Sequence, residues 1–389
     1  MRIGRDRPGE KDNNHPARFT VQNQRSGGRH AVDHAGISVY RTVNLDREYL
    51  VGKVLDQFGK KHPRTWSSFS ALQKTQVQDE CKDLVSSLEE SLAISNPAIL
   101  IDHARWAKLH FTALHFPENQ LSLMLDTLRE VLKNELPLDF RKPSDAFIAE
   151  SLTGLKKTPA EGPSLITGKN PPADSARLFL DALIVADTEQ AEKILQGAVE
   201  SGIPARDIYL HIFQPVLQET GRLWQFNRIT IAQEHFVTAT IETLMARLHD
   251  RIPVSGGEKG RRRAVLAAGV GDELHDIGIR MVADLFGMDD WDTYYTGSNT
   301  PVRSILEAAQ SRKFDLIALS ATMPRHLPDV EYLIRSLRAE PETAGLKIIV
   351  GGYPFRLVPE LWKQVGADAY AETAGDAVAI ADRLVPVRR

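Results

Sequence analysis

The sequence predicts a multidomain protein in which helical segments precede a C-terminal α/β domain with a doubly wound parallel sheet. Three observations predict this organisation. Apolar residues recur at helical spacing as far as about residue 250, two stretches rich in Gly and in Pro or charged residues interrupt the chain, and short apolar strands alternate with amphipathic helices only after the second stretch. At 389 residues, and with roughly 100 to 200 residues per domain, two or three domains are expected.

Shifts in composition give the domain boundaries. Residues 1–37 are polar and lack periodic apolar positions, which is typical of a disordered tail. Residues 155–175 concentrate Pro, Gly and small polar side chains, and residues 253–262 concentrate Gly and charge, so both are expected to be linkers. The predicted order between and after them is an all-α domain at 38–154, a four-helix bundle at 176–252 and the α/β domain at 263–389.

The helical segments rest on the spacing of their apolar residues. Leu50, Val54 and Phe58 share one helix face in the first segment, where no strand pattern of any length occurs. In the second segment, breaks near Gly202 and Asn227 separate stretches of ordinary helix length. Four such stretches predict a small bundle.

The C-terminal segment alternates strands with helices. Apolar strands are expected at 264–270, 291–297, 315–322, 347–352 and 367–372. Helices are expected near 276–287, 301–313, 327–338, 356–365 and 375–385. Five such units predict a parallel sheet of the flavodoxin or Rossmann-like type.

Charge and cysteine content narrow the classes of function. A formal net charge of −3 predicts no general attraction to nucleic acid or to an anionic membrane, and no DNA-reading helix-turn-helix is evident. No apolar run reaches the length of about 18 residues that a membrane span needs, and the first residues lack the apolar core of a signal peptide. The single cysteine, Cys81, excludes an internal disulfide. A cytoplasmic protein without direct contact to nucleic acid or membrane is expected.

Three loops are expected to meet at one edge of the sheet, because a doubly wound sheet binds its ligand at the C-terminal ends of its strands. They are the loop from Gly269 to Gly278 after the first strand, the Ser320-Ala321-Thr322 segment after the third, and Gly351-Gly352 after the fourth. A dinucleotide site is disfavoured, since Leu274 stands where the third glycine of that motif belongs.

The first loop is better explained as the presentation of a metal ligand. His275 can offer one ring nitrogen to a metal while Glu273 holds the other N–H. Gly278 and the Gly351-Gly352 pair leave room for a bulky planar ligand beside it. The alternative is a histidine that merely caps a helix in an ordinary flavodoxin-like domain.

These residues resemble the signature of cobalamin-binding domains, which is Asp-x-His-x-x-Gly, then Ser-x-Leu or Ser-x-Thr, then Gly-Gly. Here the corresponding residues are Glu273, His275 and Gly278, then Ser320 and Thr322, then Gly351 and Gly352. The resemblance implies that His275 becomes the lower ligand of cobalt, with Glu273 and Ser320 in a relay behind it. It also implies that Asp276, Ile277 and the glycines line the cofactor. Glu273 in place of Asp is the form seen in the light-sensing branch of this family.

A second resemblance lies in the bundle. Trp224 is followed after nine residues by Glu234 and His235. This spacing is similar to the Trp-x9-Glu-His motif of photoreceptors that sense light with adenosylcobalamin, and it implies that the three side chains contact the adenosyl group on the upper face. Gln225 stands where some of these photoreceptors carry a second cobalt-binding histidine. A core Trp beside a surface Glu-His pair is the alternative.

The first helical segment carries His103, His110 and His115 near Trp106 and Phe111. This stretch resembles the globin-like sensory helices that precede some cobalamin domains, and photocobilins pair such helices with a bilin. The resemblance implies a second chromophore, biliverdin or another bilin. Ordinary core or surface histidines are the alternative for each residue.

The expected function is light sensing by bound adenosylcobalamin, with no catalytic residue of its own, acting through a change of oligomer or a separate protein partner. A homo-oligomer is expected. The alternatives from other classes are a corrinoid methyl carrier of a methyltransferase system and a protein for cobalamin storage or delivery.

Overall fold

The computed structural model describes residues 19–22, 42–159, 162–168, 171–249, 262–271 and 275–386. The chain forms two compact units. The first contains Met1–Asn96 and Leu123–Ile148, and the second contains Pro97–Ser122 and Ala149–Arg389. Most of the expected tail, and the second expected linker up to residue 261, lie outside the described residues.

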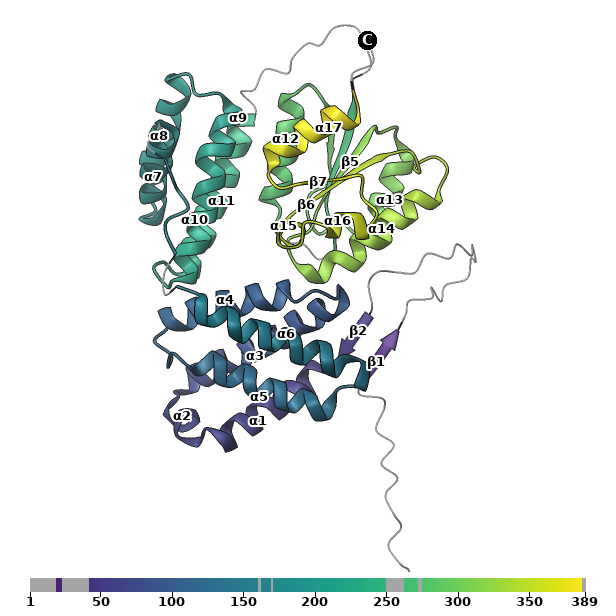
Figure 1. The fold of residues 1–389 in the computed structure, drawn as a ribbon. Helices are drawn as coiled ribbons and strands as arrows, with labels where there is room; N and C mark the ends of the chain where they lie inside the picture. Colours follow the sequence, from purple (N-terminus) through teal and green to yellow (C-terminus); the bar gives the residue numbers. More distant parts are fainter. Residues whose placement is uncertain are drawn as a thin grey trace, which may run out of the picture. The chain divides into compact units, whose positions relative to one another are not determined.

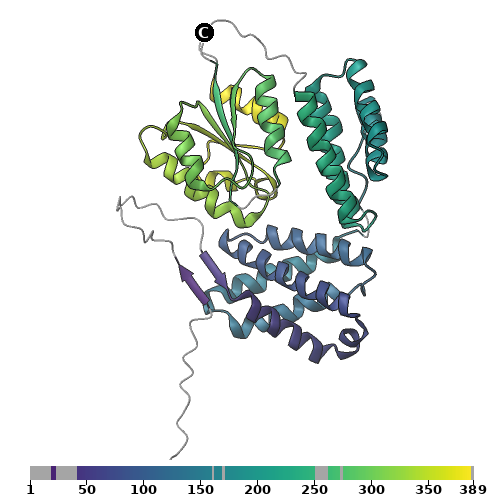
Figure 2. The same ribbon diagram turned by 180° about the vertical axis from the view of Figure 1, so that it is seen from behind.

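Among its described residues, the first unit is helical apart from one strand pair (Figure 1, Figure 2). Strand β1 pairs antiparallel with β2, so residues 19–22 form a strand where the sequence predicted a disordered tail. The elements of this unit are β1 (Phe19–Gln22), β2 (Thr42–Leu45), α1 (Arg47–Lys61), α2 (Pro63–Ser68), α3 (Ala71–Ala93), α5 (Gln120–Glu135) and the first part of α6 (Leu138–Lys157).

The longest helix of this unit shows how its sequence sets its limits. The side chain of Ser70 accepts a hydrogen bond from the backbone of Gln73, and the side chain of Gln73 accepts one from the backbone of Ser70, so a capping box begins α3. Cys81 is buried in α3, and burial raises the pKa of its thiol to about 12. The thiol of Cys81 therefore stays neutral, and the side chain acts as a small apolar core residue.

The second unit opens with helix α4 (Ala98–Ala113) and continues with a bundle. The bundle consists of α7 (Pro171–Ile184), α8 (Thr188–Glu200), α9 (Ala205–Ile208), the π-helix η1 (Tyr209–Phe213), α10 (Gln214–Gln225) and α11 (Ile231–His249). Because α9, η1 and α10 follow one another without a break, the bundle has the four helices that the sequence predicts. The predicted breaks are real: Gly202 and Asn227 both have positive φ, at 82° and 52°.

A π-helical turn within the third bundle helix was not predicted. The backbone N–H of Gln214 bonds to the carbonyl of Tyr209, five residues back. Pro215 follows, and in a regular α-helix its ring would clash with the carbonyl of His211. The wider turn relieves this clash, and the extra residue rotates the rest of the helix by about 100°. The π-turn therefore sets the direction of the side chains on α10.

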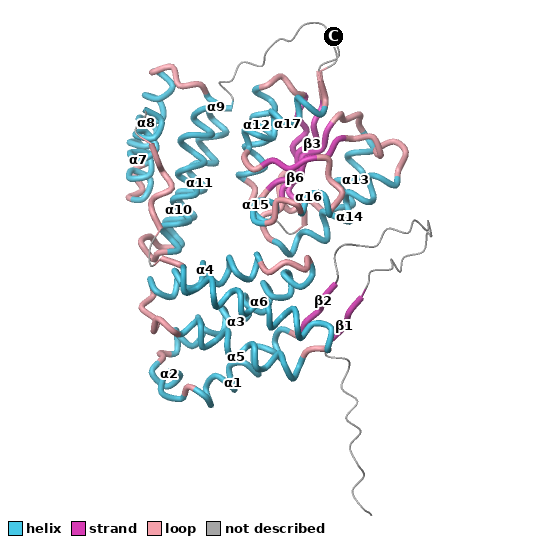
Figure 3. Tube along the Cα trace, viewed as in Figure 1, coloured by secondary structure: helices cyan, strands magenta, loops and turns pink. Residues whose placement is uncertain are grey.

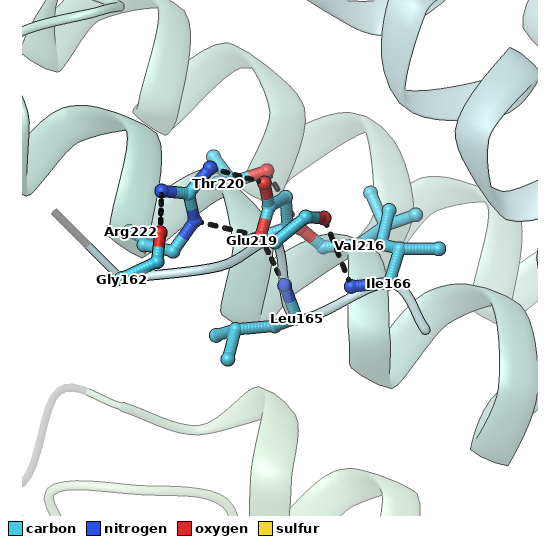
Figure 4. A network of polar contacts seen from close by, with 8 residues as sticks. Gly162, Leu165, Ile166, Val216, Glu219, Thr220 and Arg222 are labelled. Carbon is cyan, nitrogen blue, oxygen red and sulfur yellow. Dashed lines mark hydrogen bonds and ion pairs between the residues drawn. The ribbon is translucent and has the colours of Figure 1, made fainter. Parts of the chain in front are cut away.

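A short segment of the expected first linker is fixed to the bundle (Figure 4). The carboxylate of Glu219 on α10 accepts a hydrogen bond from the backbone N–H of Leu165, at 2.7 Å, and two from Arg222. Arg222 also donates to the carbonyl of Gly162, and Ile166 is buried in the bundle core. Burial alone would raise the pKa of Glu219, but Arg222 and the Leu165 N–H more than offset this and lower it.

Replacing Glu219 with Gln is expected to reduce the free energy of unfolding by roughly 2 kcal/mol. The change breaks a charge-assisted pair and leaves the half-buried guanidinium of Arg222 without its carboxylate partner. A lowered folded-state pKa gives stability that is present above the unfolded value near 4.5 and is lost as pH falls below it. Chemical denaturation at pH 7 and pH 4 measures both effects: the stability difference between the two proteins should shrink at pH 4. A difference that is independent of pH would contradict this assignment.

The α/β domain contains one parallel five-stranded sheet of order β4-β3-β5-β6-β7 (Figure 3). Its strands are β3 (Ala264–Gly269), β4 (Asp292–Tyr295), β5 (Leu316–Ser320), β6 (Lys347–Gly351) and β7 (Ala369–Ala371). Its helices are α12 (Ile277–Met288), α13 (Val302–Ser311), the 3-10 turn η2 (Pro324–His326), α14 (Leu327–Ala339), α15 (Tyr353–Leu357), α16 (Leu361–Gln364) and α17 (Ala374–Leu384). The predicted doubly wound, flavodoxin-like fold is confirmed.

Both faces of this sheet are buried, which explains the continuous apolar strands. Every residue of β3 is buried. Val265 and Ala267 pack in a core cluster with residues of α12 and α17, including Phe286 and Val378. Helices α13 and α14 lie together on the opposite face (Figure 2). Among the described residues, no helix is long and apolar enough to cross a membrane.

Candidate functional site

The three predicted loops begin at one level of the sheet. The register places Gly269 beside Ser320, and Ser320 beside Gly351. The strand order reverses between β3 and β5, because the chain runs outward from β3 to β4 and then returns to β5 on its other side. This is the switch point at which doubly wound sheets bind their ligands. His275 follows β3, and Thr322 follows β5.

Glycines keep this edge open. Gly352 has φ of 101°, and a Cβ at this position would lie 2.1 Å from the carbonyl oxygen of Ala321. A Cβ on Gly351 would lie 3.2 Å from the carbonyl oxygen of Ala371. Gly278, in the first turn of α12, is exposed and has nothing within 4 Å of its missing side chain. Two strand ends can therefore approach closely, while the space above Gly278 stays free.

A cavity of about 220 Å³ lies at these strand ends. The predicted site residues that line it are Gly278, Ser320, Thr322, Gly351 and Gly352. The sequence analysis missed four polar lining residues: Gln214, Gln218, Glu372 and Thr373. Glu372 and Thr373 follow β7, so the strand-end rule that selected the other loops also selects them. The two glutamines come from α10 and had no sequence signal, because the π-turn sets their direction.

The predicted lower-ligand loop is described from His275 onward. His275 is exposed, and Asp276, not His275, is the N-cap of α12. The alternative that His275 serves only as a helix cap is therefore disfavoured. Glu273 lies outside the described residues, so its place in the relay with Ser320 stays a prediction. The side chain of Ile277 is buried in the core cluster of the bundle. Its predicted contact with the cofactor therefore stays a prediction.

Acidic groups and tyrosines join the bundle to the α/β domain beside this loop. The carboxyl groups of Glu242 on α11 and Asp276 are hydrogen-bonded, and burial together with Asp276 raises the pKa of Glu242. The hydroxyl of Tyr209 donates to Asp284 on α12 at 2.9 Å. Burial, and then Asp276, raise the pKa of Tyr295 on β4 to about 12. The Tyr209–Asp284 hydrogen bond therefore links η1 to α12, and the contact between Glu242 and Asp276 links α11 to the start of α12.

Trp224 lies at the end of α10 in an aromatic group that includes residues of α4. Its ring centroid is 5.8 Å from that of Trp106 and 5.8 Å from that of His110. Gln225 adds two polar contacts: its side chain donates to the carbonyl of Trp106 at 3.2 Å, and its own carbonyl lies 2.9 Å from Nδ1 of His110. Gln225 therefore holds α4, which is a role that the sequence did not reveal.

The predicted Glu-His pair lies at the start of α11. Glu234 is half-buried and accepts a hydrogen bond from Thr238 at 3.1 Å. The ring of His235 lies 3.3 Å from the Glu234 carboxylate, and its side chain is 74% exposed. Neither residue nor Trp224 lines the strand-end cavity, so their contact with an upper ligand stays a prediction.

The three histidines expected near a second chromophore have different environments. His103 stacks on Trp106 at 6.2 Å, and Trp106 stacks on His110 at 5.1 Å. His115 has a positive φ of 59° and follows the last turn of α4, so it acts in ending that helix. Stacking and helix ending account for these residues without a ligand, and the bilin stays a prediction.

The residues present fit a large planar cofactor with a slender tail. Glycines let the strand ends approach closely beside a cavity, open space lies over Gly278, and an exposed imidazole follows the first strand at the switch point. An imidazole in this position can ligate a metal, while a polar cavity beside it can accept a nucleotide tail. The fold and site therefore define a cobalamin-binding protein.

Comparison with known proteins gives the family. B12 binding domain models match residues 263–380 and 176–249. Dimethylamine corrinoid protein 3 of Methanosarcina mazei is 30% identical over 139 residues, which are 36% of this chain and 81% of that protein. Dimethylamine corrinoid protein 3 of Methanosarcina acetivorans is 27% identical over 206 residues, which are 53% of this chain and 94% of that protein. The chain belongs to the B12-binding corrinoid proteins.

A solved structure, the monomethylamine corrinoid protein of Methanosarcina barkeri, is 21% identical and covers 55% of this chain and 99% of its own, with a TM-score of 0.48. The matched models begin at the residues where the bundle and the α/β domain were expected to begin. None of the relatives named here is described as a photoreceptor. The B12 binding domain models and the two dimethylamine corrinoid proteins confirm B12 binding and favour the methyl-carrier alternative over the expected light sensor.

Proposed function

We propose that the protein senses light with adenosylcobalamin held between the bundle and the Rossmann-like domain. What supports this is the spacing of Trp224, Glu234 and His235, together with the aromatic group in which Trp106 and His110 lie against the Trp224 ring. A methyl carrier has to expose the upper face of its cofactor to a donor and then to an acceptor. A rigid aromatic wall instead suits an upper ligand that is kept until it is released.

Each predicted site residue then has a defined role in holding the cofactor. His275 would hold the metal through its imidazole, and Ser320, at the end of β5, would orient the ligand loop together with Glu273. Trp224 would supply an apolar wall, and the carboxylate of Glu234 would accept hydrogen bonds from ribose hydroxyls. Bound adenosylcobalamin supplies a cobalt–carbon bond that light can break. Loss of the contacts that Trp224 and Glu234 would make with the adenosyl group would change the preferred arrangement of the bundle.

A second candidate is a corrinoid methyl carrier that works with a methyltransferase. Its support comes from the two relatives named above, both of which are dimethylamine corrinoid proteins. In this case the chain itself would not be catalytic. Output to a separate protein, and a homo-oligomer, are further proposals under either function.

Illumination of the reconstituted protein separates the two functions. Protein loaded with adenosylcobalamin in the dark is expected to change its visible absorption spectrum under green light and to release the adenosyl group. A matched sample loaded with hydroxocobalamin has no such bond and is expected to show no change. Gel filtration of the dark and illuminated samples measures whether the oligomer changes.

The methyl-carrier function has its own test. The protein is loaded with methylcobalamin in the dark and mixed with a thiol acceptor and a corrinoid methyltransferase. Rapid demethylation would support the carrier. An adenosylcobalamin spectrum that light leaves unchanged beyond the behaviour of the free cofactor in the same buffer would refute the sensor.

A further inference from the structure

Helix α4 lies outside both matched B12-binding regions but belongs to the same compact unit as they do. Asp102, Trp106 and His110 are spaced four residues apart, so they lie on one face of the helix. A different set of residues, among them Leu100, Ala104 and Phe111, is buried. The contacts of Asp102, Trp106 and His110 are therefore additional to the core packing of α4.

The first of these contacts reaches the glycine loop. The hydroxyl of Tyr353, which directly follows Gly352, donates a hydrogen bond to the carboxylate of Asp102. Arg356 on α15 attracts the same carboxylate and lies over the Tyr353 ring, 5.6 Å from its centroid. Burial raises the pKa of Asp102, against the opposing effect of nearby positive charges. A hydrogen bond to a half-buried carboxylate is among the stronger kinds.

The second contact reaches the end of α10. Trp106 and His110 pack on Trp224, and Gln225 donates from its side chain to the Trp106 carbonyl. Because the carbonyl oxygen of Gln225 can only accept, His110 donates to it from Nδ1. These bonds fix the last turn of α10 and the ring of Trp224 relative to α4.

We infer that α4 is a clamp on the cobalamin site: it links Tyr353 at the glycine loop to Trp224 on the bundle, and so controls how fast cofactor enters and leaves. The glycine loop belongs to the α/β domain, and Trp224 belongs to the bundle. A ligand held between these two parts departs when they separate. One helix bonded to both opposes that separation, and its bonds break before the cofactor is released.

Cofactor release from three variants tests the clamp. Tyr353→Phe, Asp102→Asn and the double variant are loaded with hydroxocobalamin and chased with excess cyanocobalamin, and the exchange is followed by absorption. Each single variant is expected to release cofactor about tenfold faster than the unmutated protein, and the double variant no faster than either. Tyr332→Phe is the matched control, because Tyr332 is 58% exposed on α14. It is expected to release cofactor at the unmutated rate.

A second measurement needs no cofactor. Hydrogen–deuterium exchange of residues 98–113 in the cofactor-free protein is expected to accelerate in Tyr353→Phe and in Trp106→Phe, at an unchanged melting temperature, but not in Tyr332→Phe. Equal release rates and equal exchange in Tyr353→Phe and Tyr332→Phe would overturn the clamp. So would single effects that simply add in the double variant. Neither measurement uses light or methyl transfer, so the clamp and the proposed function can fail separately.

Discussion

Replacement of His275 with alanine is expected to weaken cobalamin binding by at least about 10–100-fold, since that is the loss when only a partner behind a metal ligand is removed, and to abolish the absorption of imidazole-ligated cobalt. The reason is position: His275 is the exposed imidazole that follows β3 at the switch point. Titration of the apoprotein with hydroxocobalamin, followed by absorption, measures both effects.

The control for this experiment is His211→Ala. His211 lies on η1, and its side chain is 59% exposed, so its removal is expected to leave affinity and spectrum unchanged. Retention of an imidazole-ligated spectrum in His275→Ala would show that another residue ligates the metal. The bundle and the sheet would keep their assignments, whereas the lower-ligand assignment would be lost.

Replacement of Gly352 with alanine is expected to destabilise the α/β domain by about 2–4 kcal/mol and to prevent cobalamin binding. Its φ of 101° is unfavourable for any residue with a side chain, and the new methyl group would meet the Ala321 carbonyl oxygen at 2.1 Å. Relief of this clash requires separation of the strand ends that form the cavity. Thermal unfolding and cofactor titration measure the two effects.

Gly287→Ala is the matched control for this second prediction. Gly287 lies within α12, has no positive φ, and has nothing within 4 Å of an added Cβ. Alanine is favoured over glycine in a helix, so this variant is expected to be as stable as the unmutated protein or more so. A Gly352→Ala protein with unchanged stability and binding would show that the glycine loop is not a fixed part of the site.

The α/β domain could be predicted from the sequence because its signals are local. A parallel strand buried on both faces has to be apolar throughout, as β3 is, and Gly352, which has a positive φ and no room for a Cβ, marks the loop after β6. One prediction in this domain was less accurate: the helix expected near 356–365 is two short helices, α15 and α16, separated by residues 358–360.

The contacts of α4 could not be predicted, because they depend on residues far apart in the chain. Asp102 and Tyr353 are 251 residues apart, and no periodic pattern relates them. The glutamines that line the cavity depend on the π-turn before them, which comes from a clash between Pro215 and the preceding turn. The strand pair β1–β2 is also a long-range pairing, which explains its absence from the prediction.

Cobalt is expected to be bound by the imidazole nitrogen of His275. Electron paramagnetic resonance of the reduced, cobalt(II) form tests it most directly, with protein in which histidine is labelled with nitrogen-15. The axial nitrogen splits each cobalt line, and we predict that labelling changes this splitting from a triplet to a doublet, because the bound nitrogen comes from the protein. A splitting that remains a triplet would show that cobalt keeps its own unlabelled base, and would contradict the account.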